Sequence, residues 1–147
     1  SRIMSRLGSV SGLGLMRDVT ALPALESALY DKAMMVRAAA ADALGLLRQP
    51  SSADALGKAL NISANFRSGK SLFVRKHIVD AIGAVGSAVS LDLLVTSTAD
   101  ADPSVQLSAR NGLVRMTSKS FGRGAKVSPQ EAASWADWWQ KEGKVAR

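Results

Sequence analysis

The residues that could carry out acid–base or nucleophilic chemistry are few in this sequence. The chain has one histidine, His77, and no cysteine. A Ser–His–Asp or Cys–His set needs its members within hydrogen-bond reach, and no motif places such partners around His77. The same count excludes a metal site built from imidazole or thiolate ligands. We therefore expect a chain that is not an enzyme, with no cofactor and no catalytic or metal-binding residues.

Two carboxylates recur at one spacing and could form a recognition surface. Asp42 and Asp80 occupy equivalent positions in two successive helical segments, and Asn111 occupies that position in a third. Neighbouring helices pack about 8–10 Å apart, which is too far for two carboxylates to share a proton. The three residues are interpreted as a polar stripe that contacts a partner, or as ordinary solvated positions.

A basic segment, residues 61–73, carries cations with aromatic residues between them. Arg67 and Lys70 lie within it together with two phenylalanines, and Lys76 follows it. Such a loop could contact phosphates or an acidic partner, and the simpler interpretation is an exposed loop with its phenylalanines folded beneath it. The candidate partner-binding residues of the chain are Asp42, Arg67, Lys70, Lys76, Asp80, Arg110 and Asn111.

All three tryptophans of the chain lie near its C-terminal end. Ser128 and Glu131 have the spacing of a capping box, with a proline at the first helical position, and they predict the start of a helix. Trp135, Trp138 and Trp139 fall on about one face of that helix. We favour a capping helix that covers the last repeat over an aromatic platform for a base, a peptide or a ligand.

A repeated helical pattern must position these residues. Val74 and Val105 are 31 residues apart, and Val36 and Val74 are 38 apart, which is one period plus an insertion of seven. After each valine, apolar or small residues recur with the spacing of an amphipathic helix. A fixed period in the thirties predicts an all-α solenoid, in which stacked helical hairpins bury each other's apolar faces.

The first unit has a proline in its first helix, an aspartate in the turn, and a valine followed by arginine at the start of the second helix. The second unit lacks the proline and the aspartate, and the third keeps the aspartate and the valine but has Gln106 in place of the arginine. The residues of this pattern are Pro23, Asp31, Val36, Arg37, Val74, Arg75, Asp100 and Val105. The combination resembles HEAT repeats, in particular the short bacterial HEAT-like repeats found in phycobilisome lyases. The resemblance implies a right-handed α-solenoid of HEAT-like hairpins (an α-α superhelix) and a role in binding another macromolecule.

The aspartates and arginines of the pattern are interpreted as structural pairs. Stacking is expected to bring the turn aspartate of one unit near the arginine of the next unit, where the carboxylate accepts hydrogen bonds. The side chains left free for a partner are predicted two, five and six positions after each valine, on a concave surface lined by the second helices. Arg110 belongs to this set.

The period divides the chain into one domain of several units. They are an N-terminal half-repeat (1–17), repeat 1 (18–48), repeat 2 with its insertion (49–86), repeat 3 (87–117), and a linker with the Trp-bearing helix (118–147). Because no first helix precedes the half-repeat, we expect the chain either to be part of a longer repeat protein or to begin with an atypical capping half-unit. Exposed Ile3, Leu7 and Val10 would then favour an end-to-end homodimer.

Composition sets the remaining expectations. The net charge is +7, without a run of five like charges, which suits an acidic protein or a nucleic acid. No apolar run approaches the roughly 20 residues needed to span a membrane. The absence of cysteine and of a signal pattern favours the cytoplasm.

We expect a non-catalytic scaffold that binds a protein partner. One alternative is a nucleic-acid-binding module, similar in fold to HEAT-like DNA glycosylases. A second alternative, which rests on the family resemblance alone, is an accessory protein similar to phycobilin lyases.

Overall fold

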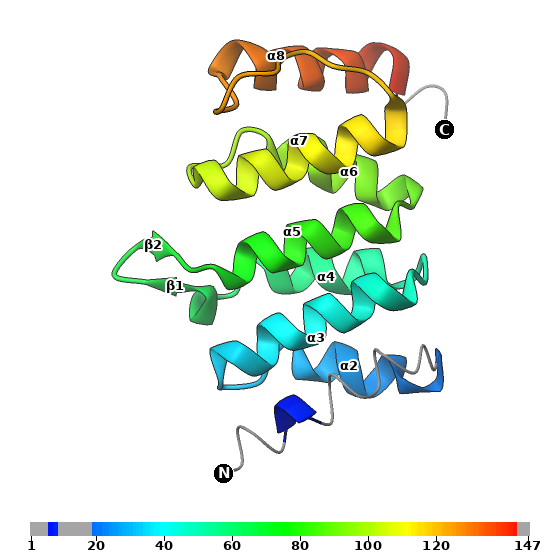
Figure 1. The fold of residues 1–147 in the computed structure, drawn as a ribbon, viewed down its shortest axis with the longest axis vertical. Helices are drawn as coiled ribbons and strands as arrows, with labels where there is room; N and C mark the ends of the chain where they lie inside the picture. Colours follow the sequence, from blue (N-terminus) through cyan, green and yellow to red (C-terminus); the bar gives the residue numbers. More distant parts are fainter. Residues whose placement is uncertain (1–5, 9–18, 144–147) are drawn as a thin grey trace.

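The computed structural model describes residues 6–8 and 19–143. Within these residues, three helical hairpins follow one another and stack in two layers (Figure 1). The first helices are α2 (Leu22–Ala28), α4 (Ser52–Leu60) and α6 (Ala88–Ser97), and the second helices are α3 (Met34–Leu47), α5 (Val74–Val85) and α7 (Pro103–Thr117). The predicted all-α fold of stacked helical hairpins is therefore confirmed.

Shorter elements complete the stack. A 3-10 turn, η1 (Val19–Ala21), leads into α2, and Pro23 stands in the first turn of that helix. At the other end, α8 (Pro129–Trp138) lies beyond α7 and continues into a π-helical turn, η3 (Trp139–Gly143) (Figure 1). None of the helices in the described part of the chain is long and apolar enough to cross a membrane.

The apolar positions of the repeat form the core. Val36, Val74 and Val105 are each at most 1% exposed, and the positions four and eight residues later in each second helix are fully buried. These later positions are Ala40, Leu44, Ile78, Ile82, Ala109 and Leu113. Each second helix thus buries one stripe between its own first helix and its neighbours in the stack.

Glycines allow the second helices to approach each other closely. A Cβ placed on Gly45 of α3 would lie 3.3 Å from the Cα of Ala81 in α5. One placed on Gly83 of α5 would lie 3.2 Å from the Cα of Gly112 in α7. Gly45 and Gly83, which directly follow the buried Leu44 and Ile82, are therefore packing residues, since a side chain at either glycine would push the helices apart.

The insertion of repeat 2 folds into a small hairpin. After a 3-10 turn, η2 (Ser63–Asn65), strands β1 (Phe66–Arg67) and β2 (Lys70–Ser71) pair antiparallel. Ser68 and Gly69 connect them with φ angles of +52° and +77°. Two positive φ angles in a two-residue connection are typical of a type I′ turn. The sequence predicted only a loop, because glycine supplies one of these angles and serine gives no signal for the other.

The N-terminal half-repeat falls mostly outside the described residues, as do Ile3 and Val10. Residues 6–8 are helical, and Leu7 is half-buried against the core. The expectation that Leu7 is exposed is therefore wrong, because its side chain packs against the hydrophobic core.

Candidate functional site

The repeated arginine joins each unit to the unit that follows it. The Nε atom of Arg6 lies 2.9 Å from a carboxylate oxygen of Asp31, and an Nη atom of Arg75 lies 2.6 Å from Asp100. The predicted pairing had the opposite direction, from a turn aspartate to the arginine of the next unit, and it is wrong. The first turn of each second helix faces the turn of the following hairpin, so the arginine reaches forward along the chain.

This arrangement favours the ionised form of Asp100. Burial raises the pKa of Asp100, but the hydrogen bonds from Arg75 and from the backbone N–H of Asp102 outweigh it, so the pKa lies below its ordinary value. Arg75 itself is 3% exposed, and the ring of Phe66 from the hairpin lies 4.7 Å from its guanidinium carbon. Phe66 is thus explained by packing, as the simpler interpretation of the loop expected. Phe73 is 46% exposed, so that interpretation is wrong for the second phenylalanine.

Arg37 occupies the equivalent position in repeat 1, but no carboxylate of the described residues accepts a hydrogen bond from its guanidinium. Its Nε donates to Oδ1 of Asn65 at 2.9 Å, and its two Nη atoms donate to backbone carbonyls, including those of Asp31 at 2.8 Å and Ala64 at 2.9 Å. Burial lowers the pKa of Arg37, and the charge of Asp31 partly opposes this. The sequence analysis did not identify Asn65 as a partner of Arg37. The one indication was that repeat 2 has no aspartate in the turn between its helices, so another acceptor had to take its place.

Arg110 was predicted to contact a partner, and the structure contradicts this. The residue is 8% exposed, and its Nε and Nη2 atoms donate to the two carboxylate oxygens of Glu131 at 2.9 and 2.6 Å. It also donates to the backbone carbonyls of Gly124 and Lys126. The position five residues after the valine faces the next element of the stack, which here is the linker and α8. Val79 and Ala41, at the same position in the other units, are also fully buried.

The start of α8 differs from a complete capping box. The side chain of Ser128 accepts a hydrogen bond from the N–H of Glu131 at 3.0 Å, as predicted. The carboxylate of Glu131 does not return to Ser128 but points inward to Arg110 and to Nε1 of Trp135. The hydrogen bonds from Arg110 lower the pKa of Glu131 and outweigh the effect of burial. In return, Glu131 raises the pKa of Arg110.

The three tryptophans are part of the core. Trp135 is fully buried, and Trp138 and Trp139 are 8% and 7% exposed. The indole N–H of Trp139 donates to Asp92 of α6 at 2.8 Å, and Phe121 packs edge-on against Trp135. The alternative of an aromatic platform for a ligand is wrong for these residues, because their rings pack against one another and α6 instead of facing solvent.

The exposed side of α3, α5 and α7 contains the polar stripe that the sequence suggested. Asp42 and Asp80 border one hollow, and Asp80 and Asn111 border the next. The carboxylate of Asp42 lies 2.8 Å from Nδ1 of His77, which links α3 to α5. The carboxylate of Asp80 lies 2.8 Å from Nζ of Lys76 on its own helix.

The two hollows adjoin at Asp80 and cross all three second helices. Their volumes are about 310 and 560 Å³. Two large apolar side chains are exposed there, Leu46 at 43% and Val114 at 38%. We call this surface the second-helix face. It comprises Asp42, Gly45, Leu46, Arg48, Asp80, Ala81, Ala84, Asn111, Val114 and Arg115.

The basic hairpin lies away from the second-helix face. It extends from the beginning of α5 (Figure 1). The two hollows are lined instead by residues from the later turns of α3, α5 and α7. Arg67 and Lys70 are exposed on it, and Lys70 borders a separate hollow of about 570 Å³ with Asp100 and Asp102. The structure therefore separates Arg67 and Lys70 from the predicted stripe.

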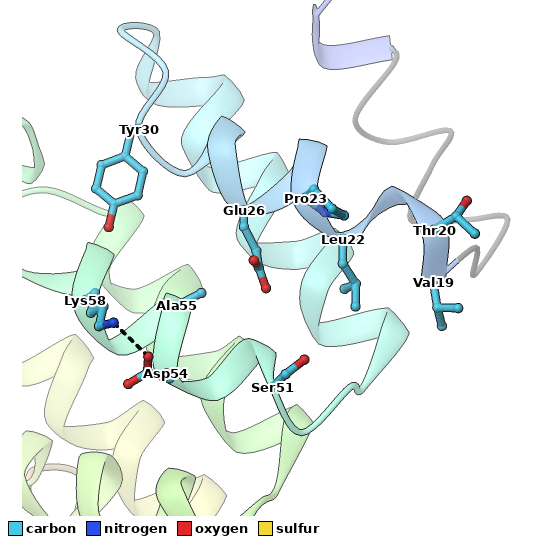
Figure 2. A pocket seen from close by; sticks show the side chains of 10 residues that line it. All are labelled: Val19, Thr20, Leu22, Pro23, Glu26, Tyr30, Ser51, Asp54, Ala55 and Lys58. Atoms are coloured by element: carbon cyan, nitrogen blue, oxygen red, sulfur yellow. Dashed lines mark ion pairs between the residues drawn. The ribbon is translucent and has the colours of Figure 1, made fainter.

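A further groove lies between the first helices α2 and α4. Its volume is about 690 Å³, and its sides include Leu22, Glu26 and Tyr30. Figure 2 shows the carboxylate of Glu26 directed into this groove, while Lys58 and Asp54 pair with each other on α4. The groove is bordered by two helices, whereas the second-helix face extends over three.

Comparison with known proteins agrees with this architecture. A sequence profile of HEAT repeats matches residues 4–68, which include α2, α3 and α4. The assignment to the HEAT repeats is therefore confirmed for residues 4–68, and the structure extends the same hairpin arrangement to the end of α7. No curated protein matches the chain. HEAT repeats generally mediate protein–protein interaction.

Proposed function

We propose that the chain is a non-catalytic protein-interaction module whose partner binds the second-helix face. The observation that carries this proposal is the continuity of the two hollows over three stacked helices, with exposed Leu46 and Val114 beside charged groups. Apolar side chains surrounded by polar ones are typical of protein-binding surfaces.

The face is preformed, which favours binding. Its floor is the contact between Gly45 and Ala81 and the adjoining turns of α5 and α7, where backbone lies against backbone. Little conformational entropy is lost when a partner binds to such a rigid surface.

A nucleic acid is less well supported as the partner of this face. Asp42 and Asp80 both border the hollows and would lie close to any phosphate bound there. The exposed cations of the hairpin, Arg67 and Lys70, lie elsewhere on the molecule, so the net charge of +7 is not concentrated on the second-helix face.

The proposal can be tested by partner capture from an extract of the native host. The wild-type chain is compared with Leu46→Glu/Val114→Glu and with a matched control, Val89→Glu, whose side chain is 48% exposed on α6. We expect the wild type and the control to capture the same protein and the double variant to lose it, with all chains melting at similar temperatures. Retention by the double variant, or equal loss in the control, would refute a role for this face.

A further inference from the structure

We infer that the partner segment that binds the second-helix face is an acidic peptide with apolar side chains, whose carboxylates pair with Arg48 and Arg115. The inference rests on the proposed function and specifies the chemistry of the partner.

The two arginines lie on the two outer helices' sides of the face, each near the C-terminal end of a helix. Arg48 follows the last residue of α3 and has a left-handed backbone, and Arg115 lies in the last turn of α7. Each borders one of the two hollows, and both side chains are exposed. Arg115 lies over α5 at Gly83, because a Cβ placed there would be 3.1 Å from its guanidinium.

The charged groups of the face differ in whether they already have partners. Asp42 is engaged by His77 and Asp80 by Lys76. Within residues 6–8 and 19–143, the guanidiniums of Arg48 and Arg115 make no hydrogen bond or ion pair. The groups available to a ligand are therefore cationic, and a guanidinium binds a carboxylate through two parallel hydrogen bonds.

The space between the arginines favours a peptide. Leu46 and Val114 are exposed there, with Ala84 of α5 between the two outer helices. Leucine and valine contact apolar side chains, which a peptide provides and a phosphate backbone does not.

The stack sets the distance between the two carboxylates of the ligand. Arg48 and Arg115 are on α3 and α7, with α5 between them, and two helix spacings amount to roughly 16–20 Å. An extended peptide covers this distance in about five or six residues, at about 3.3 Å per residue. In an extended chain, every second side chain points to the same side, so the carboxylates and the apolar residues between them should alternate with polar residues.

The probe for this geometry is a fluorescein-labelled heptapeptide, Glu-Ser-Leu-Ser-Leu-Ser-Glu, measured by fluorescence anisotropy. Its counterpart with lysine at both ends, and a version with serine in place of both leucines, test charge and apolar contact separately. We expect the wild-type chain to bind the acidic peptide and to bind the other two at least about tenfold more weakly.

The arginines are tested by Arg48→Asn/Arg115→Gln, in which asparagine suits the left-handed backbone at the first position. The control, Arg67→Gln/Arg123→Gln, removes the same charge from exposed positions outside the face. We expect the first variant to weaken the acidic peptide about tenfold or more and the control to change it less than about twofold. Equal weakening in both variants would show attraction by net charge and would overturn the inference.

The same variants separate this inference from the proposed function. The inference fails alone if the captured host protein is lost by Leu46→Glu/Val114→Glu but retained by Arg48→Asn/Arg115→Gln. Both ideas fail if neither double variant loses it. Binding of a labelled DNA duplex that is abolished by Arg48→Asn/Arg115→Gln would also overturn the inference, because the arginines would then form a phosphate site.

Discussion

Two neighbouring interfaces of the stack use the same buried arginine with different partners. Between repeats 2 and 3, Arg75 makes two hydrogen bonds to the carboxylate of Asp100, at 3.0 and 2.6 Å. Between repeats 1 and 2, Arg37 makes its hydrogen bonds to the amide of Asn65 and to backbone carbonyls. Both arginines are 3% exposed.

The difference shows how an insertion can be accommodated without losing the arginine. The hairpin of repeat 2 displaces the turn, and the residue that then meets Arg37 is Asn65. Its oxygen accepts from Arg37, and its amide donates to the carbonyl of Ala59 at 3.0 Å. The guanidinium of Arg37 is thus stabilised by several neutral amide and carbonyl dipoles, whereas that of Arg75 is stabilised by the carboxylate of Asp100.

The largest effect on the free energy of unfolding is expected when Arg75 or Arg37 is replaced by methionine, and its size should differ between the two. Arg75→Met leaves Asp100 without its counter-charge, and we expect it to lower the free energy of unfolding by about 3 kcal/mol. Arg37→Met leaves only neutral acceptors, for which we expect a loss of about 2 kcal/mol. Urea denaturation of both variants measures the two losses. An equal or larger loss for Arg37→Met would mean that the carboxylate adds nothing to the second interface.

The second-largest effect is expected for Asp100→Asn, which gives the interface between repeats 2 and 3 a neutral amide like that between repeats 1 and 2. We expect Asp100→Asn to lower the free energy of unfolding by about 2 kcal/mol at pH 7. The folded-state pKa of Asp100 lies below its ordinary value, so its contribution is fully present above about pH 4 and is lost as the pH falls through the folded pKa. The wild type and Asp100→Asn should therefore converge in urea titrations as the pH falls below about 4. A gap that stays constant with pH would exclude the ion pair as its source.

A smaller effect is expected when a carboxylate is supplied to Arg37. Asn65→Asp adds the charge but loses the amide donor to the carbonyls of Ala59 and Leu60, so we expect a net loss of about 1 kcal/mol. Asn61→Asp is the matched control, because only the oxygen of Asn61 is used, accepting from Arg75 at 2.7 Å. The control should be neutral or slightly stabilising in thermal melts. Stabilisation by Asn65→Asp would show that the first interface lacks a charge.

The smallest effect concerns the exposed link between the same helices, α3 and α5. Asp42 and His77 lie 2.8 Å apart, but their side chains are 56% and 36% exposed. A double-mutant cycle of Asp42→Ala and His77→Ala should give a coupling energy below about 1 kcal/mol, because water and salt screen surface pairs. A coupling as large as that of the buried pair Arg75–Asp100 would make the surface pair a structural element of the stack.

The core could be predicted from the sequence because it obeys a local period. Buried residues such as Ile78 recur along the helix with the spacing of one helix face, and that spacing does not depend on which element packs against the face. The direction of the arginine pairs and the burial of Arg110 could not be predicted in this way. Both depend on which neighbour each side of a helix meets, and for Arg110 that neighbour is a linker without a repeat pattern.

The candidate site was predictable only in part. Asp42, Asp80 and Asn111 share a repeat position and do lie along one surface. Arg48 and Arg115 do not share a repeat position, so no period marks them. They border the hollows because of where the helices end and how closely the helices approach, which are properties of the assembled stack.

The contact between Gly83 and Gly112 also has a mechanical consequence. Side chains between helices can change rotamer and absorb a small displacement, but two backbones in contact have no such freedom. We therefore expect α5 and α7 to move as one body when the stack is bent, so that a displacement of one helix is passed to its neighbour instead of being absorbed between them.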